Sequence, residues 1–103
     1  MPQVLASLRI NPENPDAVNT YFEAAIPLIE AVGGKVIEQI DLGEQLIGKT
    51  GSSFVFVVEY PDRDAIDRVF SSAQYKSIIP VRDKAFSHYN ISIIEMRELP
   101  EFA

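Results

Sequence analysis

The sequence contains no cysteine and only one histidine, His88. Without cysteine, the chain can form no disulfide, no thiolate nucleophile and no cysteine-ligated zinc site. With one histidine, a single chain cannot assemble a metal site from several imidazoles. We therefore expect no metal ion and no cofactor, and the search for chemistry falls on arginine, carboxylate and phenol groups.

Basic residues are scarce relative to acidic ones. The chain has 9 Lys and Arg against 15 Asp and Glu, a net charge of −6. A surface of this sign repels the phosphates of nucleic acids and anionic lipids, so we expect neither nucleic acid nor membrane as a partner. No apolar run approaches the roughly 20 residues that span a bilayer. The first residues also lack the pattern of a signal peptide, and we expect a cytoplasmic protein.

The length and the apolar content are those of one small domain. With 103 residues, of which 47% are hydrophobic, residues 1–103 are expected to form a single domain with one core. Strands are predicted where apolar residues alternate: Val4–Ile10, Lys35–Leu42, Ser53–Tyr60 and His88–Arg97.

Helical spacing of apolar residues predicts the segments between the strands. A long helix is expected from Pro15 to about Val32, with Asn14 as its N-cap. The Gly33-Gly34 pair should end this helix, because glycine tolerates positive φ. Asp62 should cap a second helix. A short third helix is expected from Ser71, paired with Gln74 in a capping box, to Pro80, after which Val81–Phe86 could form another turn or two.

The predicted order of elements is β-α-β-β-α-β. This order indicates an α+β fold of the split βαβ, or ferredoxin-like, type: one four-stranded antiparallel sheet in the order 4-1-3-2, with the helices on one face. The other face would carry a mixture of apolar and polar side chains: Leu5, Ser7, Arg9, Val55, Val57, Glu59, Asn90, Ser92 and Ile94. Because so apolar a face is unfavourable in water, we expect two copies to form a homodimer through their sheet faces.

Three stretches resemble a known family: Tyr21–Lys35, Val57–Pro61 and Ser72–Arg82. The first stretch carries Gly33-Gly34 just before its last residue, Lys35. The last stretch combines Tyr75 with Pro80 and Arg82. In this combination the chain resembles the family catalogued as domain of unknown function 1330, within the dimeric α+β barrel superfamily. The resemblance implies a ferredoxin-like homodimer whose two sheets face each other. It implies no reaction, because related families include cofactor-independent monooxygenases, haem-handling enzymes and small-lactone isomerases.

Arg9, Glu59 and His88 form the first candidate site. If strands one and three were parallel neighbours, Arg9 and Glu59 would meet at the same end of the sheet, beside the start of strand four at His88. A cation, a carboxylate and an imidazole there could bind an acidic or enolisable molecule and move a proton. The alternative is an Arg9–Glu59 ion pair at the dimer contact with an exposed His88.

Tyr75 and Arg82 form the second candidate site. Tyr75 could close a pocket, and Arg82 could bind a carboxylate in a bidentate manner. The alternative is a Tyr75 packed in the core with its hydroxyl at the rim, and an Arg82 paired with Asp83 or Glu59.

Two short motifs have a structural as well as a functional interpretation. Residues 43–50, GEQLIGKT, match the phosphate-loop pattern, but a strand rather than a helix is predicted to follow them, so we interpret them as a hairpin connection. Pro2 would become an N-terminal prolyl amine if Met1 were removed, as in tautomerases that use such an amine as a base. This tautomerase hypothesis is the least favoured.

Three functions stay open at the level of sequence. The first is a homodimeric small-molecule-binding protein, with or without cofactor-free catalysis on a small acidic or enolisable metabolite, whose cavity lies between helices and sheet or between facing sheets. The second is a non-catalytic dimeric interaction or regulatory module. The third is the tautomerase that depends on Pro2.

Overall fold

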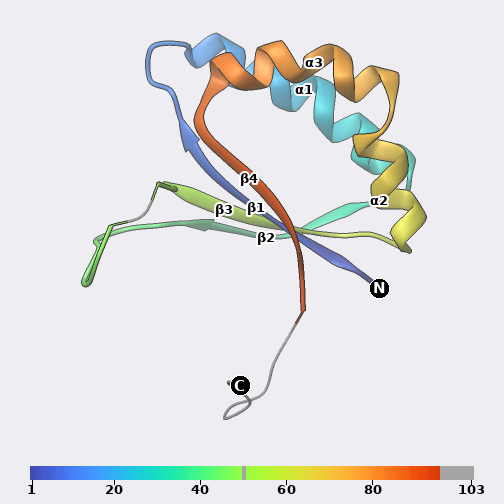
Figure 1. The fold of residues 1–103 in the computed structure, drawn as a ribbon, viewed down its shortest axis with the longest axis horizontal. Helices are drawn as coiled ribbons and strands as arrows, with labels where there is room; N and C mark the ends of the chain where they lie inside the picture. The colour runs from blue at the N-terminus through green and yellow to red at the C-terminus, as the bar shows by residue number, and fades with distance from the viewer. Residues whose placement is uncertain (50, 96–103) are drawn as a thin grey trace.

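The computed structural model describes residues 1–49 and 51–95, and Figure 1 shows their arrangement. The elements, in chain order, are β1 (Gln3–Ile10), α1 (Pro15–Ala31), β2 (Lys35–Asp41), β3 (Phe54–Glu59), α2 (Arg63–Phe70), α3 (Ala73–Ala85) and β4 (Phe86–Ile94). In Figure 1 the helices lie on one side of the sheet, and α2 sits at one end of it. Within the described ranges, no helix has the length and apolar character needed to cross a bilayer.

The four strands form one sheet in the order β2-β3-β1-β4. All three strand pairs are antiparallel. The predicted α+β class, strand order and placement of the helices on one face are therefore confirmed. The expectation that strands one and three run parallel is wrong, because in a split βαβ arrangement β3 lies between two parallel strands and runs opposite to both. This antiparallel pairing changes which side chains share an end of the sheet.

The strands have one face toward the helices and one face that no helix covers, here called the uncovered face; at one end of it Gly51 and Ser52 lie against His88 and Ser7. On β1, Val4, Ala6 and Leu8 are buried, whereas Leu5 and Ser7 between them are only partly buried. The same alternation holds on β3. The core therefore fills the space between the helices and one sheet face, as the period-2 pattern predicts.

The ends of the helices follow local capping rules. The Asp62 side chain accepts a hydrogen bond from the Ala65 N–H at 2.8 Å, which confirms it as the N-cap of α2. At α3 the cap is Ser72, whose Oγ accepts from the Tyr75 N–H at 3.0 Å, so the predicted capping role of Ser71 is wrong. The helix continues through Pro80 to Ala85, so the further turn or two left open after Pro80 belongs to α3 itself.

Gly33 and Gly34 end α1 for two different physical reasons. Gly33 has φ +84°, a conformation that side chains with a Cβ rarely adopt. Gly34 is buried, and a Cβ built there would lie 2.5 Å from Ile29 Cγ2 and 3.0 Å from Tyr60 Cε1. The turn after α1 is thus packed directly against the Tyr60 ring.

Replacing Gly34 with alanine is expected to destabilise the fold, because the added methyl group overlaps Ile29 and Tyr60. Overpacking of this kind should lower the melting temperature by roughly 5 to 15 °C in a domain of this size. Thermal unfolding followed by circular dichroism measures the shift. Gly43→Ala is the matched control, since nothing lies within 4 Å of a Cβ at Gly43. Equal melting temperatures for the two variants would contradict the packing described.

Candidate functional site

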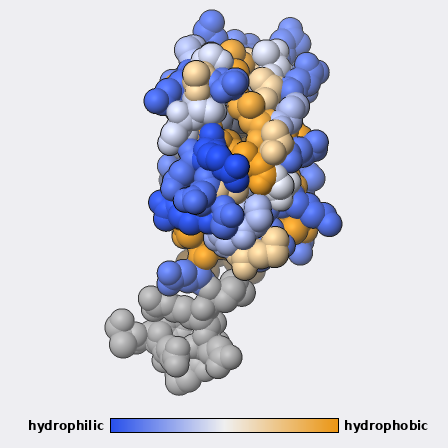
Figure 2. Space-filling model, turned by 90° about the vertical axis from the view of Figure 1, so that its right-hand side faces the viewer, coloured by the Kyte–Doolittle hydropathy of each residue, from blue (hydrophilic) through white to orange (hydrophobic). Residues whose placement is uncertain are grey.

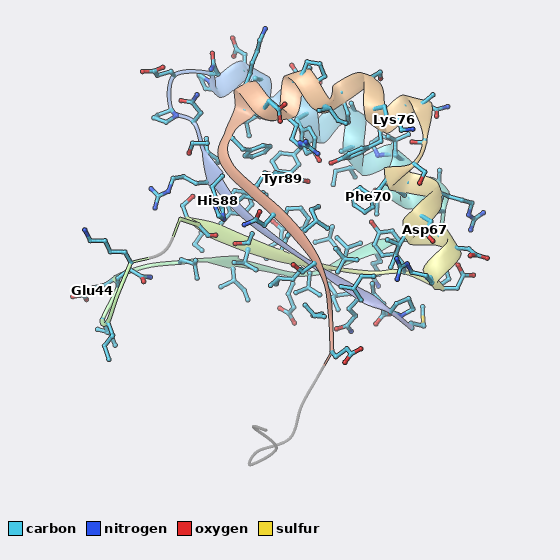
Figure 3. All side chains as sticks on the ribbon, viewed as in Figure 1. Glu44, Asp67, Phe70, Lys76, His88 and Tyr89 are labelled. Atoms are coloured by element: carbon cyan, nitrogen blue, oxygen red, sulfur yellow. The ribbon has the colours of Figure 1, made fainter. Side chains whose placement is uncertain are left out.

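All four tyrosines of the sequence line one cavity between the helices and the sheet. They come from four different elements or their ends: Tyr21 from α1, Tyr60 directly after β3, Tyr75 from α3 and Tyr89 from β4. The remaining walls are apolar and include Phe22, Ile29, Phe56, Val69 and Phe70. The cavity has a volume of about 20 Å³. In Figure 3, Tyr89 and Phe70 lie in the layer between the helices and the sheet, away from Glu44 in the β2–β3 connection.

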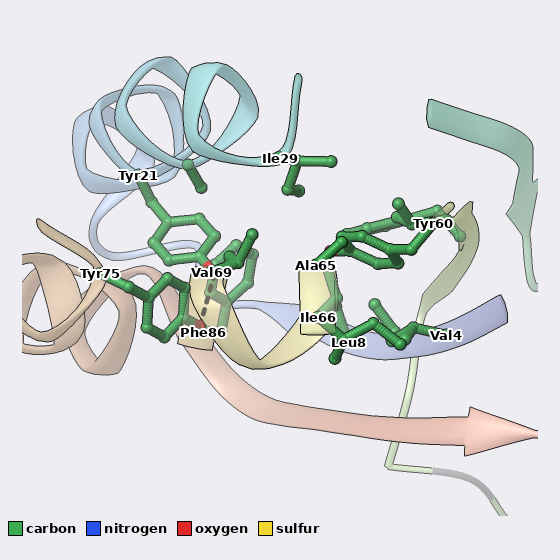
Figure 4. Close-up of a cluster of buried hydrophobic side chains, with 14 of the residues drawn as sticks. Val4, Leu8, Tyr21, Ile29, Tyr60, Ala65, Ile66, Val69, Tyr75 and Phe86 are labelled. Carbon is green, nitrogen blue, oxygen red and sulfur yellow. Dashed lines mark hydrogen bonds between the residues drawn. The ribbon is translucent and has the colours of Figure 1, made fainter. Parts of the chain in front are cut away.

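Three of the phenols form one hydrogen-bond network. The Tyr21 hydroxyl lies 3.0 Å from the Tyr75 hydroxyl and 2.5 Å from the Tyr89 hydroxyl. Figure 4 shows the contact between Tyr21 and Tyr75 as a dashed line. The rings also pack edge to face, with Tyr21 and Tyr89 centroids 5.6 Å apart. The network therefore fixes α1, α3 and β4 relative to one another.

Arg82 joins this network to the surface. Its Nη1 donates to the Tyr75 hydroxyl at 3.3 Å, and its guanidinium carbon lies 5.4 Å from the centre of the Tyr89 ring. Its side chain is 26% exposed and its carboxylate partner Asp83 is 3.5 Å away and 67% exposed. A loose, solvated pair of this kind leaves guanidinium hydrogen-bond donors beside the Tyr75 hydroxyl, although Arg82 itself does not line the cavity.

The environment keeps the phenols neutral and the guanidinium charged. Burial, with a further contribution from Tyr89, raises the pKa of Tyr21 far above its ordinary value. Burial, with a further contribution from Tyr75, likewise raises the pKa of Tyr89. Burial alone would lower the pKa of Arg82, but its hydrogen bond and proximity to Tyr75 outweigh that effect and the pKa is raised. The site at neutral pH is therefore a set of neutral hydroxyls beside one permanent positive charge.

The Tyr60 hydroxyl differs from the other three. Tyr60 has no exposed surface, and among the described residues its buried hydroxyl has no hydrogen-bond partner. Burial, followed by proximity to Tyr75, raises its pKa to about 12. A buried hydroxyl without a partner is destabilising, because it has lost its water without gaining a replacement.

The structure separates the first group of predicted site residues. Arg9 and His88 are direct cross-strand neighbours on β1 and β4, as expected. Glu59, however, pairs with Gln3 at the other end of β1, roughly 20 Å from Arg9 at the usual rise of a strand. The prediction that Glu59 joins Arg9 and His88 is therefore wrong, and an Arg9–Glu59 ion pair within one chain is excluded with it.

Arg9, Glu59 and His88 nevertheless all lie on the uncovered face of the sheet, as predicted. The Arg9 Nε donates to the Gly51 carbonyl at 2.8 Å, and the His88 ring contacts the Asn90 amide at 3.1 Å. Glu59 accepts from the Gln3 amide at 3.3 Å. Catalytic roles for these three residues stay predictions. Among the described residues, no three His, Asp or Glu side chains are placed to hold a metal ion.

Of the second candidate site, Tyr75 is packed in the core and lines the cavity, and Arg82 pairs with Asp83, as the alternative interpretation had it; Arg82 also donates to the Tyr75 hydroxyl. Sequence reasoning did not place Tyr21, Tyr60 and Tyr89 with them. A signal existed, since Tyr89 alternates in phase with the apolar residues of β4 and Tyr21 lies one helical turn from Val18 and Ala25 on the apolar stripe of α1. What the sequence could not show is that the four tyrosine side chains line one cavity.

The two short motifs lie away from this cavity. Residues 43–50 belong to the connection between the antiparallel strands β2 and β3, which confirms the hairpin interpretation. Pro2 is half-buried, and its carbonyl accepts from the Tyr60 N–H at 2.9 Å. Pro2 therefore positions the Tyr60 backbone, and its proposed role as a base stays a prediction.

A two-layer α+β domain with a phenol-lined cavity under its helices is thus the class that the fold and the site define. Comparison with protein families narrows this class. The profile of the family described as domain of unknown function DUF1330 matches residues 4–96. The chain belongs to this family. No curated protein matches the chain.

Solved structures with the same fold come from distant organisms. A protein of unknown function from Rhodopseudomonas palustris superposes with a TM-score of 0.79 at 22% identity, over 94% of this chain and 82% of that chain. An Arabidopsis thaliana protein gives 0.72 at 6% identity, over 96% and 98% of the two chains. A Nitrosomonas europaea protein provisionally described as an antibiotic biosynthesis monooxygenase gives 0.64 at 11% identity, over 93% and 98%. At these identities the similarity shows the fold alone.

Removing single phenol hydroxyls should change the stability differently for a tyrosine in the network and for Tyr60, whose hydroxyl has no partner among the described residues. Tyr21→Phe deletes a hydroxyl with two buried partners and should lower the free energy of unfolding by about 1–3 kcal/mol. Tyr60→Phe deletes a hydroxyl without a partner and should leave the stability unchanged or raised. Urea denaturation measures both. If Tyr60→Phe is as damaging as Tyr21→Phe, the Tyr60 hydroxyl has a partner and the description of the cavity is wrong.

The raised pKa values also predict how stability depends on pH. The pKa of Tyr60 is raised from 10.0 in the unfolded chain to about 12 in the folded chain. The part of the folding stability that depends on this proton is therefore fully present below pH 10. Above that pH the unfolded chain loses phenol protons that the folded chain keeps, so stability falls as the pH rises. Ultraviolet absorbance should show tyrosinate appearing together with loss of circular dichroism. Ionisation of Tyr21, Tyr60 or Tyr89 near pH 10 in the folded protein would contradict their burial.

Proposed function

We propose that this chain is a small-molecule-binding protein that works as a homodimer and holds its ligand in the cavity between helices and sheet. The observation that carries the proposal is that all four tyrosines line one cavity and that Arg82 contacts one of them, Tyr75, from outside the lining. Four phenols on four separate segments are not required by the fold, since leucine or phenylalanine would fill the same core without polar atoms to satisfy. Convergent polar groups in an otherwise apolar cavity are typical of a ligand site.

The chemistry of these groups favours an acidic ligand. A permanent guanidinium beside neutral hydroxyls stabilises negative charge, either on a carboxylate or on an enolate that forms from a carbonyl compound. Of the described residues that line the cavity, none carries a carboxylate or an imidazole. His88, the group best suited to move a proton, lies on the opposite face of the sheet. The site thus supports recognition of a small acid more strongly than proton transfer. Catalysis without a cofactor is an additional hypothesis beyond binding.

Binding requires the cavity to open. Its volume of about 20 Å³ accommodates one water molecule and no metabolite. Phe70 at the end of α2 packs edge-on against Tyr75 with ring centroids 5.0 Å apart, and it is only half-buried. In Figure 2, apolar side chains reach the surface in a band at the height of the helices, on the side of the molecule where α2 lies. Outward movement of Phe70 and Arg82 would join the cavity to this surface.

The dimer in this proposal rests on the uncovered sheet face. Leu5, Val55, Val57, Ile40 and Ile94 occupy this face on four adjacent strands. Ile40 is 48% exposed. This apolar surface is interrupted by Ser7 and Ser92 and bounded at one end by Lys35, Glu38 and Glu59. We expect it to pack against the same surface of a second copy across a two-fold axis.

A non-catalytic dimeric module is the second candidate function. The observation that favours it is the small volume of the cavity, which in its closed form has room for a water molecule only. In that case the tyrosine network would serve stability alone. The experiment on Arg82 below separates the two candidates.

Arg82→Gln should weaken the binding of small carboxylic acids by roughly 10-fold or more, because a charged hydrogen bond is replaced by a neutral one. Isothermal titration with benzoate measures the affinity. Arg63→Gln is the matched control. Arg63 is exposed on α2, pairs with Asp67 and does not line the cavity. Benzoate that binds neither protein, or binds wild type and Arg82→Gln equally, would favour the dimeric module.

Val57→Asp should convert a dimer into a folded monomer. The substitution places a charge at the centre of the proposed contact, while in one chain its side chain faces away from the core. Sedimentation should report twice the 11.5 kDa chain mass for wild type and the single mass for the variant. Gln74→Asp, on the exposed side of α3, should stay dimeric. A wild-type protein that sediments as a monomer at micromolar concentration rules out the dimer.

A further inference from the structure

We infer that the Tyr60 hydroxyl binds a second oxygen on the ligand, so that the ligand class is a hydroxylated aromatic carboxylic acid. The inference rests on the proposed function, since it assumes that an acid enters this cavity and meets Arg82. It adds a second functional group on the ligand, an oxygen that would bind the Tyr60 hydroxyl at the end of the cavity away from Arg82.

Tyr60 is held too firmly for its hydroxyl to find a partner by moving. Its backbone N–H donates to the Pro2 carbonyl at 2.9 Å, and Pro61 follows it directly. Gly34 lies so close to the ring that a Cβ there would be 3.0 Å from Tyr60 Cε1. The residue has no exposed surface, and the cavity beside it has room for one water molecule at most. The unsatisfied group is therefore a fixed feature of the closed cavity.

The two ends of the cavity carry different polar groups. Tyr21 and Tyr75 lie at one side of the core in Figure 4, and Tyr60 reaches toward Ala65 at the other. Arg82 contacts Tyr75 at the first end. A ligand that satisfies both ends needs an anionic group for Arg82 and a separate hydroxyl or keto oxygen for Tyr60.

The walls between the two ends favour an aromatic ring. Phe22, Phe56 and Phe70 line the cavity together with the four tyrosines. These rings already meet one another edge to face, for example Phe22 and Phe56 with centroids 6.2 Å apart. A planar aromatic ligand extends this pattern, which stabilises aromatic contacts beyond the area that they bury.

Titrations of wild type and Tyr60→Phe with benzoate, meta-hydroxybenzoate and para-hydroxybenzoate test the inference. Wild type should bind at least one hydroxybenzoate about 3- to 10-fold more tightly than benzoate, because only that ligand satisfies Tyr60. Tyr60→Phe should abolish this preference, whereas Arg63→Gln, exposed on α2 and outside the cavity lining, should keep both the preference and the wild-type affinity for benzoate. Benzoate serves as the internal control for a folded, accessible cavity.

The outcomes separate this inference from the proposed function. If wild type binds benzoate in an Arg82-dependent manner but gains nothing from either hydroxyl, the cavity is a ligand site and the role of Tyr60 is overturned. A preference that persists in Tyr60→Phe overturns it as well. If none of the three acids binds, the proposed function and the inference fail together.

Discussion

The Tyr21 hydroxyl is the contact on which the arrangement of the helices over the sheet depends. It reaches from α1 to Tyr75 on α3 and to Tyr89 on β4, so one buried oxygen connects both long helices to the sheet. A phenol tip inside an apolar core is costly unless it is paired, and three tips on three elements can pair only in one relative placement. This requirement gives the core a specificity that apolar packing alone would not supply.

The same requirement explains why the cavity has a functional character. Pairing among Tyr21, Tyr75 and Tyr89 leaves Arg82 as the only charged group in the network, and it leaves Tyr60 without a partner among the described residues. Burial raises the pKa of Tyr21, Tyr60 and Tyr89, so their hydroxyls stay neutral near the one positive charge of Arg82. The opposite face of the sheet has no comparable cluster of buried hydroxyls among the described residues. Its apolar residues suit contact with a second copy better than contact with a small ligand.

Local rules made most of the fold predictable. The alternation Val4, Ala6, Leu8 fixed the buried face of β1, and Gly33-Gly34 marked the end of α1 through positive φ and close packing. The candidate site was only partly predictable. Tyr75 and Arg82 lie seven residues, or about two helical turns, apart, so the sequence alone could place them on the same side of one helix. Their convergence with Tyr21, Tyr60 and Tyr89 depends on how α1, β3 and β4 meet in space, which no local pattern states. Glu59 was misplaced for a related reason, because strand direction is a property of the whole topology.

Nuclear magnetic resonance of protein carrying ¹³C-labelled tyrosine rings tests the ligand cavity most directly. All four tyrosines line the cavity, so every labelled ring reports on it and none reports on the sheet face. Addition of an aromatic carboxylic acid should shift the ring signals of Tyr21, Tyr60, Tyr75 and Tyr89 together and saturably. Ring signals that stay unchanged while backbone amides of the uncovered sheet face respond would contradict a ligand site between the helices and the sheet.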